Sequence, residues 1–173
     1  MDIYEIRKRT AYEESILPTP KSETQNWLRG MSSDFQFAVT LTLKQSMLVK
    51  TERGQYVKKL QRKDCDAIAL RFTQKLNRQV FGKAAERYSK GLRYLTVVEG
   101  ERSCKNLHLH MAVGDFPKNI IYNHFAVHVK KAVDLVSELD EQHDVQIFDG
   151  GWTDYITKEL GRKDTDNVLW QLF

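Results

Sequence analysis

Hydrophobic and polar residues alternate along several short stretches of the chain, a pattern typical of β-strands. Residues 35–44 (FQFAVTLTLK) alternate in this way and are rich in β-branched and aromatic side chains. Residues 92–100 (LRYLTVVEG) and 106–114 (NLHLHMAVG) have the same character and are joined by the polar turn ERSCK. Residues 143–151 (HDVQIFDGG) complete the set of predicted strands.

Three other stretches repeat their hydrophobic residues at helical spacing. Residues 66–82 predict a helix that ends at Gly82, with Ile68, Phe72, Leu76 and Val80 on one face. Residues 116–140 predict a long amphipathic helix, and residues 152–161 a short one. The inward-facing residues of the long helix are expected to be Ile121, Phe125, Val129, Ala132, Val136 and Leu139.

Two segments lie outside this pattern. Residues 1–30 look peripheral: residues 1–17 are expected to form a charged helix, and a capping box from Ser22 to Gln25 predicts a second helix that ends at Gly30. Residues 45–64 are polar and basic, with a turn at Gly54, and predict a hairpin or loop that projects from the body. We therefore divide the chain into an N-terminal peripheral helical segment, 1–30, and a main domain, 31–173.

The order strand, helix, strand, strand, helix, strand predicts an α+β fold. This βαββαβ order is that of the ferredoxin-like, or RRM-like, antiparallel sheet with its helices on one face. The other face of such a sheet is free to carry a functional site. Because this fold hosts many activities, the function has to be argued from individual residues.

Composition narrows the class of protein only slightly. The 173 residues suffice for one domain, and the 41% hydrophobic and 29% charged residues are typical of a globular protein. No hydrophobic run is long enough for a membrane span, and the N-terminus lacks the apolar core of a secretion signal. Two cysteines predict reduced thiols and a cytoplasmic location. The net charge of +4 permits a nucleic-acid partner without requiring one.

Two histidines, His108 and His110, stand one residue apart in a predicted strand, so their side chains share one face. They could be packing residues, acid/base groups or metal ligands. Glu99 ends the preceding antiparallel strand, and neighbouring strands lie about 5 Å apart, so its carboxylate can meet both imidazoles. Two histidines and one carboxylate suit a divalent ion such as Mn²⁺ or Mg²⁺ that must also hold a substrate oxygen. Glu101 is the alternative carboxylate.

A tyrosine and a lysine, Tyr155 and Lys158, lie three residues apart in the last predicted helix and therefore share a face. A free tyrosine titrates near pH 10. A nearby lysine and a metal that polarises the electrophile would both favour attack by its oxygen. The alternative is a core aromatic residue beside a solvated charge.

Taken together in this order, these motifs resemble the HUH endonucleases, specifically the single-tyrosine replication initiators (Rep proteins) of rolling-circle plasmids and viruses. FAVTLTLK resembles the first Rep motif, LHLHMAV the His-hydrophobe-His motif and YITKEL the Tyr-x-x-Lys motif. The resemblance covers residues 35–162. Many viral Reps continue into a helicase domain, whereas this sequence has no Gly-rich GK[ST] loop. We expect either a small stand-alone initiator or an excised nuclease domain.

The resemblance implies a metal-dependent enzyme that nicks and joins single-stranded DNA at an origin or stem-loop and initiates rolling-circle replication. Glu99, His108 and His110 would hold the ion, Tyr155 would form a covalent 5′-phosphotyrosine and Lys158 would assist it. Host replication proteins would be partners, in the cytoplasm or in the host nucleus for a eukaryotic virus. Two alternatives remain: a single-tyrosine HUH transposase, and a non-catalytic ferredoxin-like nucleic-acid-binding module.

Basic residues in two places are candidates for DNA contacts, because a nuclease needs cations that position the phosphates. They could equally be a solvated face. Trp27, Trp152 and Tyr56 could stack on bases, with core packing as the alternative for Trp152. The basic candidates are Lys58, Lys59, Arg62 and Lys63 in the projecting segment and Arg102 and Lys105 in the turn before the histidines.

Overall fold

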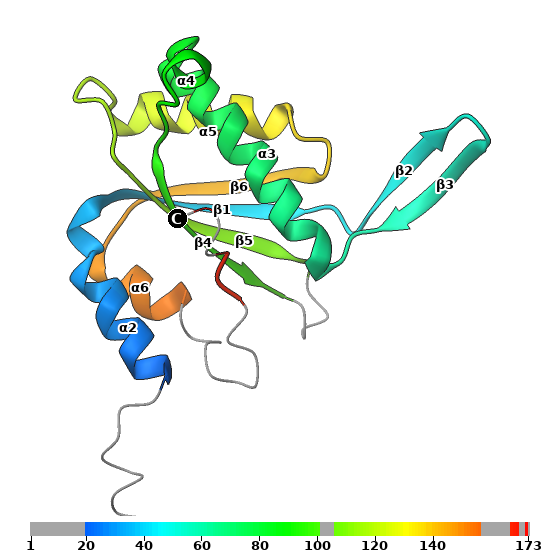
Figure 1. The fold of residues 1–173 in the computed structure, drawn as a ribbon. Helices are drawn as coiled ribbons and strands as arrows, with labels where there is room; N and C mark the ends of the chain where they lie inside the picture. The colour runs from blue at the N-terminus through cyan, green and yellow to red at the C-terminus, as the bar shows by residue number, and fades with distance from the viewer. Residues whose placement is uncertain (1–19, 101–105, 157–166, 170–171, 173) are drawn as a thin grey trace, which may run out of the picture.

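A four-stranded antiparallel sheet forms the centre of the protein. The computed structural model describes residues 20–100, 106–156, 167–169 and 172. The strands follow the order β4-β5-β1-β6, so that β1 pairs with β5 on one side and β6 on the other (Figure 1). The α+β class and the antiparallel sheet are confirmed, and the strand order is consistent with a ferredoxin-like arrangement. The strands are β1 (Phe35–Leu43), β4 (Arg93–Glu99), β5 (His108–Gly114) and β6 (Leu139–Ile147).

Two helices, α3 (Arg62–Phe81) and α5 (Tyr122–Asp134), cover one face of the sheet (Figure 1). Ile68, Phe72 and Leu76 of α3 are buried against the strands, as their spacing predicts. Helix α3 begins with a capping box between Gln61 and Asp64 and is followed by Gly82, whose φ of 58° suits glycine. The short α4 (Ala84–Arg87) follows it. None of the helices in the described ranges is long and apolar enough to cross a bilayer.

Helices also lie on the opposite face, so the prediction that helices cover only one face is wrong. Helix α2 (Pro20–Gly30) and helix α6 (Gly150–Ile156) pack there, below the sheet in Figure 1. Leu28 of α2 is buried in a cluster with Phe35, Leu95, Val97, Ala112 and Val168, and Trp152 of α6 packs against it. An ion pair of 2.6 Å between Arg29 and Asp154 joins the two helices. Periodicity along one helix cannot tell which face of a sheet the helix will cover.

The free edge of β4 is covered by the chain itself. Val168 forms an antiparallel bridge with Val97. The backbone amide of Val98 donates to the carbonyl of Asn167, and the amide of Leu169 donates to the carbonyl of Thr96, both at 2.8 Å. Residues 167–169 therefore lie alongside the outer edge of this strand.

Strands β2 (Ser46–Thr51) and β3 (Gly54–Lys59) form a separate two-stranded sheet that projects from the body (Figure 1). This confirms the hairpin predicted from the polar, basic sequence and its turn at Gly54. The strands pair from Ser46 opposite Lys59 to Thr51 opposite Gly54.

Several predicted boundaries are wrong. The helix expected over residues 116–140 spans only Tyr122–Asp134, preceded by the exposed Ile121. Val136 and Leu139 are buried, but they lie beyond the helix, and Leu139 already begins β6. Helix α2 begins at Pro20, so Ser22 lies inside it rather than at its cap. The predicted helix over residues 1–17 and the end of the last helix lie outside the described residues.

Candidate functional site

The alternation of β5 sends its side chains to two different environments. Leu109 and Met111 are buried in the core beneath α3 and α5, so His108 and His110 face the opposite side of the sheet. In the register, His108 lies opposite Glu99 of β4, and Thr40 of β1 lies opposite His110. The predicted proximity of Glu99 to the two histidines is therefore present in the structure.

The ring of His110 is held on both sides. Its Nε2 lies 2.9 Å from Oε2 of Glu99, and its Nδ1 lies 3.1 Å from Oγ1 of Thr40. The residue is only 4% exposed. Because both ring nitrogens have a polar partner, the orientation of the imidazole is fixed in this buried place.

His108 stands beside this pair without joining it. The two imidazole rings are nearly parallel, with 6.2 Å between their centroids and 17° between their planes. Within the described ranges, no group of three or more His, Cys, Asp or Glu side chains is arranged so that it could hold a metal ion. The predicted ligand set thus consists of one contacting pair, Glu99 with His110, and a neighbouring imidazole.

Tyr155 reaches the same place from helix α6. Its ring meets the ring of His110 edge to face, with 5.3 Å between centroids and 86° between planes. The ring centroid of Trp152, one turn earlier, lies 6.1 Å from that of His110 and 5.8 Å from that of Phe148. Tyr155 is nevertheless 47% exposed. A solvent-exposed tyrosine therefore lies against His110, the buried member of the Glu99–His110 pair.

The meeting of Tyr155 with His110 defines the candidate site, because it joins segments that are far apart in the sequence. No family model, curated protein or solved structure matches the chain. The chemistry of these side chains and their arrangement are therefore what indicate the function.

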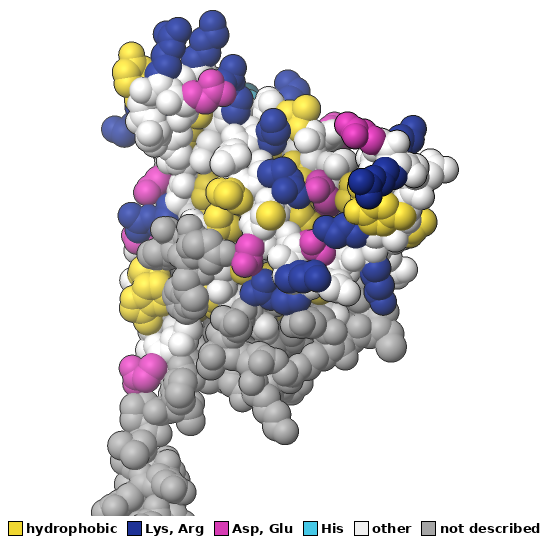
Figure 2. Space-filling view, turned by 45° about the vertical axis from the view of Figure 1, so that its right-hand side comes forward, with side chains coloured by type: hydrophobic (Ala, Val, Ile, Leu, Met, Phe, Trp, Pro, Cys, Tyr) yellow, Lys and Arg dark blue, Asp and Glu magenta, His cyan; other side chains and the backbone are white. Residues whose placement is uncertain are grey.

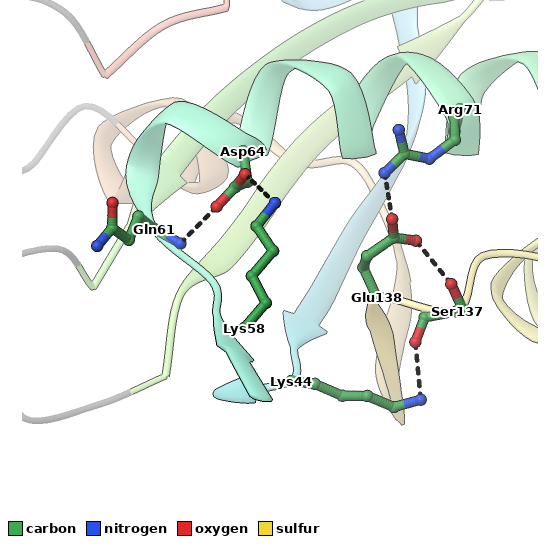
Figure 3. Close-up of polar contacts among 7 residues, drawn as sticks. All are labelled: Lys44, Lys58, Gln61, Asp64, Arg71, Ser137 and Glu138. Carbon is green, nitrogen blue, oxygen red and sulfur yellow. Dashed lines mark hydrogen bonds and ion pairs between the residues drawn. The ribbon is translucent and has the colours of Figure 1, made fainter. Parts of the chain in front are cut away.

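The basic residues predicted to bind DNA have different surroundings. Lys58 forms an ion pair of 2.6 Å with Asp64, and Arg62 one of 3.1 Å with Asp66. The hydrogen bond between Lys58 and Asp64 raises the pKa of the lysine and lowers that of the carboxyl group. Figure 3 shows this contact at the base of the hairpin. The side chains of Lys59 and Lys63 are exposed.

Other predicted site residues lie outside the described residues: Lys158, Arg102, Lys105 and the alternative carboxylate Glu101. Sequence reasoning also missed a residue, Thr40, whose hydroxyl contacts His110. Its signal was present in FAVTLTLK, where Thr40 and Thr42 occupy the polar positions of an otherwise apolar strand. Only the register between β1 and β5 brings Thr40 to the histidine.

Proposed function

We propose that this protein is a metal-dependent, site-specific endonuclease that nicks and rejoins single-stranded DNA through Tyr155, as the HUH replication initiators do. On this proposal the sheet is that of a ferredoxin-like fold, and the enzyme initiates rolling-circle replication. The observation that carries the proposal is the contact between Tyr155 and His110, beside Glu99. A nucleophile, a buried imidazole and a carboxylate come together from three separate elements.

The pair of Glu99 and His110 fits one edge of a divalent metal site. Two adjacent ligands of an octahedral ion with bonds of about 2.1 Å lie about 3 Å apart. The separation of 2.9 Å between Oε2 and Nε2 matches this. His108 would complete the set by turning its ring toward the pair. Mn²⁺ or Mg²⁺ held there would draw charge from a non-bridging oxygen of the scissile phosphate.

The protein's own groups would carry out the rest of the reaction. The phenolic oxygen of Tyr155 attacks phosphorus, so a Tyr–O–P bond forms while the bond from phosphorus to the 3′ oxygen breaks. The phenolic proton is lost to solvent, and the released 3′ oxygen takes up a proton. Lys158, three residues beyond Tyr155 in the sequence, would stabilise the developing negative charge. Because one phosphodiester replaces another, the reverse step joins the strands again.

A second candidate function is a nucleic-acid-binding module without catalysis. It is favoured by the burial of His110 and by the polar partners at both of its ring nitrogens. A satisfied, buried histidine of this kind can be structural. The two functions differ in whether DNA ever becomes attached to the protein.

The test is to look for that attachment. The protein is incubated with Mn²⁺ and a labelled pool of random-sequence single strands, and adducts that survive denaturation are counted. Tyr155→Phe removes one oxygen and keeps the ring, so the adduct should fall below detection while the fold is retained. Tyr88→Phe is the matched control, because Tyr88 is also exposed, and its adduct should equal that of the wild type.

The metal is tested in the same assay. Excess EDTA should abolish the adduct, and His108→Ala should do so without unfolding the protein. An adduct mapped to another tyrosine, or nicking that persists in Tyr155→Phe, would contradict the assignment of the nucleophile. A wild-type protein that binds DNA and never forms an adduct would favour the binding module.

A further inference from the structure

The hairpin formed by β2 and β3 exposes hydrophobic side chains that contribute nothing to the core. Leu48 and Val57 lie directly opposite each other on one face and are 53% and 70% exposed. Met47 is the hairpin residue that packs against the core of the protein. Among the strands that the structure describes, these two pair only with each other, so the sheet of the main body does not depend on them.

This exposed face is also cationic. Lys50 and Lys59 lie on the same face as Leu48 and Val57, because they are two residues away along each strand. Arg53 lies at the turn, and Glu52 is the one acidic residue of the hairpin. Within the described part of the chain, Lys50, Arg53 and Lys59 form no ion pair. Figure 2 shows Lys and Arg side chains around a hydrophobic patch where the hairpin comes forward.

The base of the hairpin is held in a fixed direction. Lys58 of β3 reaches Asp64 at the start of α3, whose carboxylate also accepts the backbone amide of Gln61 at 2.9 Å (Figure 3). The amide of Leu60 donates to the carbonyl of Gln45 at 3.0 Å, and this hydrogen bond joins the two ends of the hairpin. A ribbon anchored in this way is already oriented before it meets a ligand.

The hairpin leaves the body at the end of the sheet where the candidate site lies. Thr42, near the end of β1, is the register partner of His108. Just before the hairpin, the side chain of Gln45 donates to that of Asn106 at 2.6 Å, two residues ahead of His108. Nucleic acid lying along the hairpin would therefore continue toward Glu99 and the two histidines.

We infer that the hairpin binds double-stranded DNA adjoining the single strand that is cut, an inference that rests on the proposed function. A ribbon of six-residue strands is about 20 Å long, and the major groove, about 12 Å wide, admits a two-stranded β-ribbon. Leu48 and Val57 meet apolar groups in the groove, such as thymine methyls. Lys50, Arg53 and Lys59 contact phosphates on either side. The charge of the face selects DNA over an apolar protein surface.

The test compares binding of a 20-bp mixed-sequence duplex and a 20-nucleotide oligo(dT) by fluorescence anisotropy over a range of salt concentrations. The variant Lys50→Gln/Arg53→Gln/Lys59→Gln should weaken duplex binding on the order of 100-fold near physiological salt. Three lost phosphate contacts should make the negative slope of log K against log salt shallower by about 2.7, at about 0.9 per contact. Binding of oligo(dT) should change much less.

The matched control removes the same charge elsewhere. Lys75→Gln/Lys83→Gln/Lys118→Gln changes three exposed lysines outside the hairpin, and duplex binding should stay within a few-fold of wild type. Equal losses in the two triple variants, or an equal loss for oligo(dT), would overturn the assignment. So would unchanged duplex binding in a variant in which two glycines join Gln45 directly to Leu60.

The contribution of Leu48 and Val57 is tested separately. Leu48→Gln/Val57→Thr should weaken duplex binding several-fold and leave the salt slope unchanged. If this variant instead abolishes self-association in sedimentation while duplex binding is unaffected, the face is a protein interface and the inference fails. The adduct assay on the wild-type protein keeps the two proposals apart: a wild-type protein that forms no adduct counts against the Tyr155 chemistry, whereas the duplex-binding comparison decides the role of the hairpin.

Discussion

The two faces of the central sheet are built from the same strands and differ in character, because one is almost entirely hydrophobic whereas the other combines a smaller hydrophobic cluster with a group of polar residues. On the face beneath α3 and α5, alternate residues of β1 and β5 are almost entirely hydrophobic, including Val39, Leu41, Leu109 and Met111. On the other face the intervening positions include Thr40, His108 and His110, with Glu99 alongside. His110 and Thr42 are nearly as buried as the core residues.

The hydrophobic residues of one face stabilise the fold, whereas the buried polar residues of the other face are better explained by a chemical role. A buried polar group contributes little net stability, because its desolvation offsets its hydrogen bonds. Hydrophobic side chains could fill these polar positions, as they fill the corresponding positions on the face beneath α3 and α5. Polar residues that occupy buried positions without a stability advantage are candidates for function.

The largest loss of stability is expected from a substitution on the hydrophobic face. Phe72→Ala removes a fully buried ring from α3, and the free energy of unfolding should fall by about 3–5 kcal/mol. Urea denaturation measures the change. Leu70→Ala, at an exposed position of the same helix, should cost less than about 1 kcal/mol. Similar losses for the two variants would show that α3 does not form this core.

Substitutions on the polar face should change the free energy of unfolding less, and a single and a double variant should change it in different directions. Glu99→Leu alone takes the carboxylate away from Nε2 of the buried His110, which should cost about 1–3 kcal/mol. Glu99→Leu/His110→Leu replaces the pair by hydrophobic side chains and should restore or exceed wild-type stability. Both variants should lose the adduct. A double variant that is less stable than the single one would mean that the pair is structural.

The smallest effect concerns a polar group on the helix-covered side. His128 of α5 is half buried, and burial lowers its pKa, assisted by Lys131 and His124. The folded state therefore binds fewer protons than the unfolded state as the pH falls past the unfolded pKa, and stability should decline toward acid. His128→Gln should reduce the change in melting temperature between pH 8 and pH 5. His143→Gln is the control and should leave that dependence in place.

Much of the fold could be predicted because strand alternation and helical spacing are local signals. Residues 35–44, 92–100 and 106–114 each proved to contain a strand, and the basic segment around Gly54 a hairpin. The long helix was overestimated because Val136 and Leu139 continue the helical spacing although they belong to a turn and a strand. A hydrophobic residue can be buried in the core from a helix, a strand or a connecting segment, so burial alone does not identify the element.

The site could be predicted in part for a similar reason. Spacing within one strand placed His108 and His110 on one face, and adjacency of two consecutive strands brought Glu99 to them. The contact of Tyr155 with His110 depends on where α6 packs, and that of Thr40 on a pairing between residues 70 positions apart. Neither is encoded in local periodicity.

The cover that residues 167–169 place on β4 also matters for how the protein behaves in concentrated solution. An open sheet ends in rows of backbone donors and acceptors that can recruit a strand from another molecule. Here the chain occupies part of one such row itself, through Val98 and Leu169. The strand at the opposite border, β6, carries acidic residues instead. Losing the cover would expose a template for aggregation, and because Val168 and Leu169 are buried members of the two hydrophobic clusters, it would weaken the core as well. Resistance to aggregation and resistance to unfolding therefore share these few residues.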